Sequence, residues 1–461
     1  MAMLLRREND LAVLRIRYVQ GHRAVVEFEV QVGLGEPHPV ASCPARTLGL
    51  GSGAAALTDV DRYGELPSDL AAILGDAIRA AVGGRSSVWL EIPSPCGDLP
   101  LLPWERWLTP VVQQAVLRLP YFTLRPQADP DTLDVVLCAS SPVAKEGFDA
   151  AGHVSRLATR ILDSVPRQVG LHLFADEVAY SPLRDSFSAV PDRVVVHDPR
   201  AAAVHASPRR SPQVDDSEMI TSPWLLWIRD ELGPRSVDVV HFVGHGYHSG
   251  DRGALAFAVS PLVNTDRSWS RFIGMGQVRA LMTQIGAWSF AASGPEYNWS
   301  QPGLRELANS LARHAPGFCL VHDAGRDPEY ADVAAAYHFL YGHGASSPSP
   351  MPTIACWAHP RLVDEFSDSD RSASRDAGLL GDDYSSNLLN VQAPMTGESP
   401  SWRTSSTRVL ERLQAQWLEG APGRQPAGVG KDDVEAALRS VSELLEGNSA
   451  PGATSAGGVQ P

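Results

Sequence analysis

The chain has 461 residues, of which 44% are hydrophobic and 20% charged, and its formal net charge is −14. This composition is typical of a globular protein with room for two or three domains. The negative charge, which no arginine-rich stretch offsets, argues against nucleic acids and anionic membrane surfaces as partners.

The cysteines indicate a reducing compartment. There are five of them, widely separated and without a C-x-x-C pair: Cys43, Cys96, Cys138, Cys319 and Cys356. Such a set is typical of reduced thiols rather than of a disulfide framework or a zinc site. No signal-peptide core or membrane-spanning stretch is evident, so we expect a cytoplasmic protein that has no membrane partner.

Residues 1–60 predict a β-rich N-terminal segment. Residues 11–18 and 24–32 alternate apolar with charged residues, which is the period of half-exposed strands, and residues 20–23 between them predict a turn. Residues 40–60 are small and rich in glycine, which predicts a loop. A helical spacing of apolar residues follows at 66–82.

Residues 61–363 predict a second domain in which strands and helices alternate. The expected strands lie at 87–93, 133–141, 169–174, 194–197, 237–243, 287–292, 318–322 and 352–357, and the expected helices at 153–165, 224–232, 276–285, 303–315 and 328–341. Apolar strands alternating with helices predict a mainly parallel sheet covered on both faces, which is a three-layer α/β fold.

Residues 364–461 predict a low-complexity tail that is partly disordered, because Asp, Ser, Gly, Pro and Ala dominate there. Two short amphipathic patterns interrupt the tail near 407–418 and 432–445 and predict helices. These helices are expected to be free or packed on the domain, and the alternative is that they bind a partner.

Three histidines lie close together at the end of the strand predicted at 237–243, namely His241, His245 and His248. His241 and His245 share a face of that strand, but four residues at about 3.3 Å each separate them by ~13 Å, too far to bind one metal ion. We therefore expect no metal and no cofactor. Glycines flank His245 at the end of a parallel strand, where open α/β sheets place their sites. His245 is a candidate site residue, and the alternative is a satisfied structural histidine.

The segment Phe242-Val-Gly-His-Gly246 resembles the histidine motif of the CHAT family, a bacterial caspase-like family that also resembles separase. Residues 102–108 (Leu-Pro-Trp-Glu-Arg-Trp-Leu) are similar to an upstream element of that family, residues 303–312 to the helix after its nucleophile strand, and residues 327–342 to its late helix. The resemblance implies a caspase-like sandwich with a Cys–His dyad. His245 would be the general base and acid, and the backbone N–H of Gly246 would bind the oxyanion.

The strand predicted before residue 294 lacks the cysteine that this family places there. One alignment puts the cysteine position at Ala291, and a shift of two residues puts it at Ser293. Neither residue is a thiol, and a serine needs stronger activation than a cysteine. The protein is therefore a natural non-peptidase, a chain inactivated by substitution, or an enzyme that uses Ser293 or Cys138. Cys319 is expected in the core.

Two further features are candidates at the same edge of the sheet. Glu296 and Asn298 follow a Gly-Pro pair and predict a ligand-binding loop. His322 and Asp323 end a later strand, where they are expected to cap the core or to act as a third group.

The function that we expect is that of a CHAT-type regulatory or binding protein of a bacterial conflict or defence system. It would act through a protein or peptide partner, with any sensor module on a separate chain. The alternative is a CHAT-type peptidase that uses His245 with a nucleophile near residues 291–293.

Overall fold

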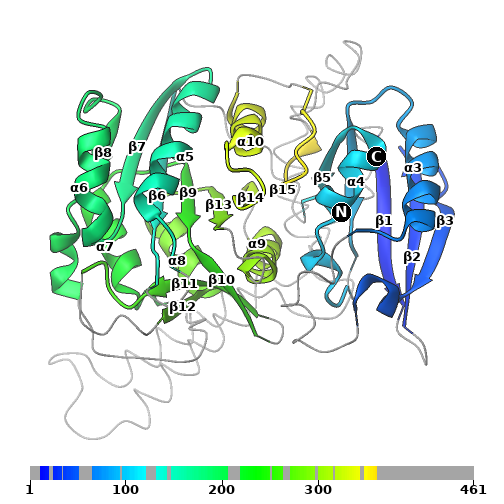
Figure 1. Cartoon of the computed structure of the whole chain (residues 1–461), viewed down its shortest axis with the longest axis horizontal. Coiled ribbons are helices and arrows are strands. Elements are labelled where there is room, and N and C mark those ends of the chain that lie inside the picture. The colour runs from blue at the N-terminus through cyan, green and yellow to red at the C-terminus, as the bar shows by residue number, and fades with distance from the viewer. Residues whose placement is uncertain are drawn as a thin grey trace, which may run out of the picture. The chain divides into compact units, whose positions relative to one another are not determined.

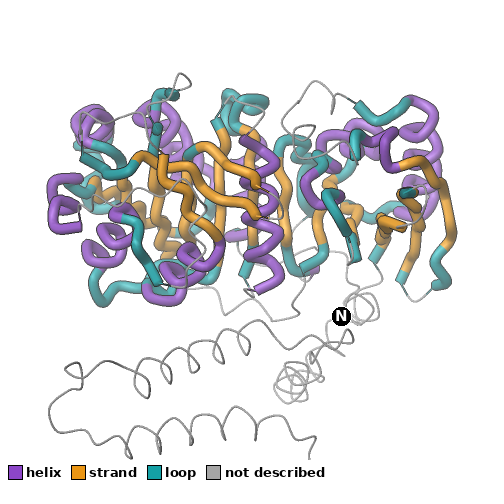
Figure 2. The backbone as a smooth tube through the Cα atoms, turned by 90° about the horizontal axis from the view of Figure 1, so that it is seen from below, coloured by secondary structure: helices purple, strands orange, loops and turns teal. Residues whose placement is uncertain are grey.

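The protein folds around one twelve-stranded sheet of mixed but mostly parallel strands, in the order β3-β2-β1-β4-β5-β15-β14-β13-β9-β6-β7-β8 (Figure 1). The computed structural model describes residues 11–360 apart from 20–23, 34, 51–64, 94–95, 121–130, 143–146, 206–218, 250–251, 263–269, 296–299, 315–316 and 343–346. Figure 2 shows helices on both sides of the strands. The predicted three-layer α/β fold with a mainly parallel sheet is confirmed.

The N-terminal part of the sheet begins as an antiparallel meander and then becomes parallel. Its strands are β1 (Ala12–Val19), β2 (Val25–Val32), β3 (His38–Pro44), β4 (Ser87–Glu91) and β5 (Ala115–Arg118), and its α-helices are α3 (Ser68–Val82) and α4 (Trp104–Val112). Strand β1 pairs with β2 in antiparallel and with β4 in parallel orientation. Strands β1 to β3, which lie in the expected N-terminal segment, thus belong to the same sheet as later strands.

The remaining strands form the part of the sheet that carries the candidate site. They are β6 (Thr132–Ala139), β7 (Gln168–Phe174), β8 (Val194–Val196), β9 (Val239–Val243), β13 (Ser289–Gly294), β14 (Cys319–Asp323) and β15 (Ile354–Trp357). The helices are α5 (Ala150–Ser164), α6 (Glu177–Ser186), α7 (Pro223–Leu232), α8 (Met275–Gln284), α9 (Gln301–His314) and α10 (Ala331–Tyr341). A small antiparallel sheet of β10 (His245–Ser249), β11 (Arg252–Ala258) and β12 (Ser270–Gly274) completes the fold.

Each central strand contributes to two hydrophobic clusters, one on each face of the sheet. Val239 and Val243 pack in the cluster that includes α5 and α10. Val240 and Phe242 pack in the cluster that includes α7, α8 and α9. All of β9 is buried as a result, which explains why its sequence is apolar at nearly every position rather than alternating.

One expectation about local structure needs correction, and two others lie outside the described residues. Residues 40–60 were expected to form a loop, but His38–Pro44 is strand β3 and Ala45–Leu48 is a 3-10 helix. Hydrogen bonding to β2 determines this strand, because its small residues and prolines carry little strand pattern. The predicted turn at 20–23 and the tail at 364–461 with its two helices lie outside the described residues.

A buried ion cluster joins the two parts of the sheet where β5 meets β15. Arg118 donates to Glu105 through Nε at 2.5 Å, and Arg305 of α9 donates to the other carboxylate oxygen through Nη1 at 3.0 Å. The guanidinium of Arg118 also lies 4.6 Å from the ring centroid of Trp357. Glu105 belongs to the Leu-Pro-Trp-Glu-Arg-Trp-Leu segment, so at least this residue of the motif has a structural role.

Candidate functional site

Three adjacent parallel strands bring the candidate residues together. His241 of β9 is paired with Ala291 of β13, and Ser293 is paired with Val243 on one side and with His322 of β14 on the other. Side chains of directly paired residues in a parallel sheet point to the same face. His241, Ala291, Ser293 and His322 therefore share the face that α5 and α10 cover.

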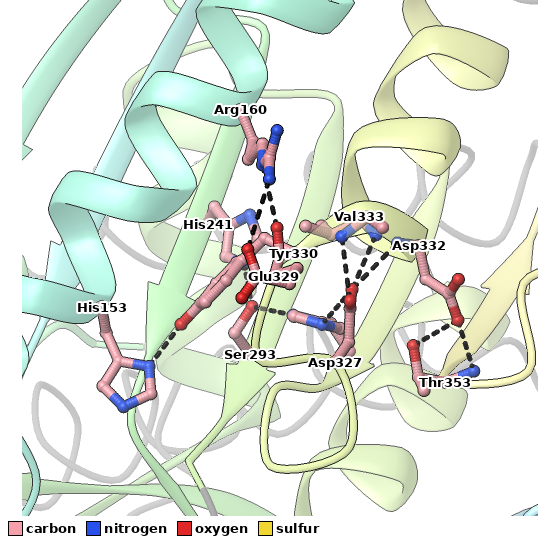
Figure 3. A network of polar contacts seen from close by, with 12 residues as sticks. His153, Arg160, His241, Ser293, Asp327, Glu329, Tyr330, Asp332, Val333 and Thr353 are labelled. Atoms are coloured by element: carbon pink, nitrogen blue, oxygen red, sulfur yellow. Dashed lines mark hydrogen bonds and ion pairs between the residues drawn. The ribbon is translucent and has the colours of Figure 1, made fainter.

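Ser293 is the centre of a buried chain of hydrogen bonds on that face (Figure 3). Its Oγ lies 2.8 Å from Nε2 of His241 and 3.0 Å from Nδ1 of His322. Nδ1 of His241 lies 2.8 Å from the hydroxyl of Tyr337 on α10, and Nε2 of His322 lies 3.2 Å from Oδ2 of Asp327. The chain therefore connects Tyr337 to Asp327 through two imidazoles and one hydroxyl.

The carboxylate of Asp327 sets the direction of the whole chain. A carboxylate only accepts hydrogen bonds, so Nε2 of His322 carries the proton, and with both rings neutral Nδ1 of His322 accepts from Ser293. The hydroxyl of Ser293 then accepts from Nε2–H of His241, and Tyr337 donates to Nδ1 of His241. In this arrangement every polar atom of the five side chains has a partner. We call this hydrogen-bonded set, which runs from Tyr337 through His241, Ser293 and His322 to Asp327, the Ser293 relay.

Asp327 is held by the helix that follows it. Its carboxylate accepts from the backbone N–H groups of Ala331, Asp332 and Val333 at 2.9, 2.9 and 3.4 Å, so it caps the first turn of α10. Burial alone would raise the pKa of Asp327. The hydrogen bond and charge of His322, together with these N–H groups, instead hold the pKa below its usual value. Asp327 is therefore the fixed anionic end of the Ser293 relay.

Tyr330 and His153 extend the polar cluster toward α5. The hydroxyl of Tyr330 and Nδ1 of His153 are hydrogen-bonded, and the ring of Tyr330 packs edge-on against His322 with 5.2 Å between ring centroids. Tyr330 precedes α10 with φ 56° and ψ 31°, a left-handed conformation that is unusual for a residue with a side chain. This backbone conformation places the ring of Tyr330 between His153 and His322.

The cluster is buried, and two of its histidines, His241 and His153, are neutral at physiological pH. His241, Ser293, His322 and Tyr337 are all 0% exposed. Burial and then the proximity of His322 lower the pKa of His241 to about 3. Burial and then the charge of Arg156 lower the pKa of His153 to about 4. The free-energy cost of burying a charged imidazole is therefore avoided by excluding the proton.

His245 is the first residue of β10, two residues after the end of β9, and it is buried against an aromatic ring. It is 1% exposed, and its ring packs edge-on against Phe148 with 5.4 Å between ring centroids. The same Phe148 ring packs on His153 at the same distance. The two histidines that the structure places on the hydroxyl of Ser293 are His241 and His322.

The backbone N–H of Gly246, the expected oxyanion donor, has a partner within the protein. It donates to Oγ of Ser300 at 2.5 Å, at the start of α9. A Cβ at position 246 would lie 2.2 Å from the carbonyl oxygen of Ser300 and 2.6 Å from the N of Leu304. Only glycine fits this approach of strand β10 to α9. The glycine after His245 thus has a packing role.

The other candidates occupy different surroundings. Ala291 is 2% exposed and packs in the hydrophobic cluster beneath α5 and α10. Cys138 and Cys319 pack in the cluster on the opposite face of the sheet, and burial raises the pKa of both thiols. Glu296 and Asn298 lie outside the described residues.

Sequence reasoning did not find most of the Ser293 relay. His241 was considered only as a metal ligand, and Tyr337, Asp327, Tyr330 and His153 were not identified as site residues. The sequence did contain a pattern that could have identified His241 as a site residue. Side chains two residues apart on a strand point to the same face of the sheet. The helix residues had no such signal, since their place depends on how α10 packs on the sheet.

Comparisons of the chain with protein families, with curated proteins and with solved structures found no match. Within the described residues, no helix is long and apolar enough to cross a membrane, and no three His, Cys, Asp or Glu side chains are grouped as a metal site requires.

Proposed function

We propose that this chain is a CHAT-related, caspase-like protein that binds a protein or peptide partner and does not cleave peptides. In this proposal it is a cytoplasmic regulatory component of a bacterial conflict or defence system, and its sensor is a separate chain. Two kinds of observation support the proposal. Several segments resemble the CHAT motifs, and the groups that a peptidase would use for catalysis already have partners within the protein.

The observation that carries the proposal is the closed hydrogen bonding of Ser293. Its hydroxyl is 0% exposed and lies within hydrogen-bond distance of two imidazoles, so no electrophile reaches it in this conformation. The N–H of Gly246 is bonded to Ser300, and His245 packs against Phe148. A nucleophile, an oxyanion donor and a general base would each have to leave its present partner before peptide cleavage.

One observation favours a second candidate function, a hydrolase in which Ser293 is the nucleophile. Ser293, His322 and Asp327 follow one another at 3.0 and 3.2 Å, which is the order of nucleophile, base and orienting carboxylate in serine hydrolases. On attack, the Ser293 proton would pass to Nδ1 of His322, and Asp327 would stabilise the imidazolium through Nε2–H. The base in this candidate is His322 rather than His245.

Incubating the purified full-length protein with a peptide library separates the two candidates. We expect the wild type, His245→Ala and His322→Ala proteins to give the same cleavage profile as buffer. Cleavage by the wild type that is lost in Ser293→Ala and His322→Ala would overturn the binding proposal and support the hydrolase. Cleavage lost in Ser293→Ala and His245→Ala would instead support a dyad of the CHAT type.

A further inference from the structure

We propose that a basic cluster beside the end of β13, formed by Arg106, Arg305 and Arg326 with Gln301, receives an acidic residue of the peptide partner. This inference rests on the proposed binding function and specifies the chemistry of the partner. Nothing in the Ser293 relay uses these four side chains.

The sheet places the cluster next to the candidate site. Gly294, the residue after Ser293, is paired with Asp323 of β14, and the backbone N–H of Ala324 donates to the carbonyl of Gly294. Arg326 follows three residues after Asp323 and contacts its carboxylate through Nε at 3.5 Å. The side chain of Arg326 is 45% exposed, so it is open to solvent at this edge.

Positive charge exceeds negative charge among the residues that the structure describes at this edge of the sheet. Among the described residues, the arginines are Arg106, Arg118, Arg305 and Arg326, and the carboxylates that act on them are Glu105 and Asp323. Glu105 is already shared by two of the arginines. A chain with a net charge of −14 thus concentrates cations at one place. Focused positive potential of this kind attracts anionic ligands and speeds their association.

The electrostatic state of Arg106 agrees with this excess. Its pKa is lowered to about 10, first by burial and then by the charges of Arg326 and Arg305, which outweigh the opposing effect of Asp323. An added carboxylate would relieve this repulsion. Arginine also suits the task, because its planar guanidinium binds a carboxylate with two parallel N–H groups.

Gln301 adds an independent observation that points to a peptide. Its Nε2 donates to the carbonyl of His322 at 3.3 Å. Its Oε1 is buried and has no hydrogen-bond partner among the residues that the structure describes. Gln301 is 8% exposed, and a Cβ on Gly294 would lie 2.5 Å from its Nε2, so the amide sits directly against the end of β13. An orphan acceptor calls for an N–H donor. An acidic residue of a peptide supplies both a carboxylate for the arginines and an N–H for Gln301.

Binding of labelled peptide pools to the full-length protein tests the proposal. Three pools of acetylated tetrapeptides share three randomised positions and differ at the last position, which is Asp amide, Asn amide or Ala with a free carboxylate. Fluorescence polarisation measures the affinity of each pool. We expect the Asp amide pool to bind at least tenfold more tightly than the Asn amide pool. Tighter binding of the free carboxylate pool would assign the site to a chain terminus instead of a side chain and overturn the stated specificity.

Variants that remove either a positive or a negative charge from the basic cluster make the test more specific. Arg326→Gln and Arg106→Gln are expected to weaken binding of the Asp amide pool at least tenfold, and Asp323→Asn to strengthen it severalfold. Arg17→Gln is the matched control, since the Arg17 side chain is 47% exposed and pairs with Glu29 at 3.0 Å on β1 and β2. It should leave binding unchanged.

Three results would overturn the inference: equal affinity for the Asp and Asn pools, no binding of any pool, or equal losses in Arg326→Gln and Arg17→Gln. Unchanged thermal unfolding of the Arg326→Gln protein confirms that a loss of binding is not a loss of folding. Cleavage of the pools would contradict the proposed function, yet the ratio of Asp to Asn affinities would still report on the basic cluster.

Discussion

Ser293 and His322 are hydrogen-bonded across two neighbouring strands, with 3.0 Å between Oγ and Nδ1. The same hydroxyl lies 2.8 Å from Nε2 of His241, so one serine links three strands through polar groups in an otherwise hydrophobic layer. Buried networks in which every member is satisfied stabilise one arrangement of the chain, because leaving any partner unpaired is costly. The Ser293 relay is therefore a structural feature whose loss should be measurable.

Replacing Ser293 with alanine should destabilise the protein by roughly 2–4 kcal/mol, because it leaves buried groups of His241 and His322 without a partner. The measurement is the free energy of unfolding in urea. Ser222→Ala is the matched control, since Ser222 is also 0% exposed and its Oγ has no hydrogen-bond partner within the described part of the chain. It should change stability by less than about 0.5 kcal/mol. Equal effects of the two substitutions would contradict the structural role of Ser293.

Stability should fall as the pH is lowered through the range from 6.5 to about 4. The pKa values of His241 and His153 are lowered from 6.5 to about 3 and about 4, chiefly by burial. The unfolded chain therefore binds more protons than the folded chain below pH 6.5. The stabilising contribution is complete above that pH and is lost by up to about 1.4 kcal/mol per pH unit for each histidine. Asp327, whose pKa is also lowered, adds a further loss in stronger acid.

Urea unfolding at intervals between pH 7.5 and 5 measures this dependence. His241→Asn removes one titrating group and should reduce the slope by up to about 1.4 kcal/mol per pH unit. A wild-type stability that is flat across this range, or a variant whose slope is unchanged, would show that His241 is not buried in its neutral form.

Gly246→Ala should destabilise the protein by about 3 kcal/mol, since the new methyl group would meet the backbone of α9. The nearest atom would be the carbonyl oxygen of Ser300 at 2.2 Å. Gly147→Ala is the control, because there the nearest atom is Oγ of Ser141 at 3.5 Å, an ordinary contact. Thermal unfolding of both variants measures the difference. Similar midpoints would mean that β10 and α9 do not pack as closely as described.

Glu105→Gln should cost about 3–5 kcal/mol, because it removes the shared counter-ion of two buried arginines. Arg118 and Arg305 are 3% exposed each, and Glu105 is 0% exposed. Asp76→Asn breaks an ion pair whose carboxylate side chain is 81% exposed, and it should have almost no effect. Urea unfolding compares the two variants, and a small effect at Glu105 would mean that solvent reaches the cluster.

The sequence predicted the strands and helices that carry strong hydrophobic patterns, and it failed where the pattern is weak. Strand β9 was identified because both of its faces are buried, which makes the residues from Val239 to Val243 almost continuously apolar. Strand β3 was expected to be part of a loop, since its small residues and prolines show no alternation. Strands β10 to β12 were not predicted, because close packing against α9 selects glycine and alanine at several of their positions.

The site was harder to predict than the fold. His245 drew attention because glycines flank it, and the structure places it just past the end of β9, as the first residue of β10. The partners of Ser293, however, come from positions 52 residues before it and 29 residues after it along the chain, and only the register of three strands unites them. Tyr337 and Asp327 reach the Ser293 relay through α10, whose docking no local pattern of the sequence encodes.

Labelling with a fluorophosphonate, which reacts with activated serine hydroxyls, tests the central claim most directly. The native full-length protein is treated with the probe, and the peptide that contains Ser293 is analysed by mass spectrometry. Because the hydroxyl of Ser293 is 0% exposed and bonded to two imidazoles, we predict no adduct on Ser293. A stoichiometric adduct on Ser293 that disappears in His322→Ala would contradict the account and identify the chain as a serine hydrolase.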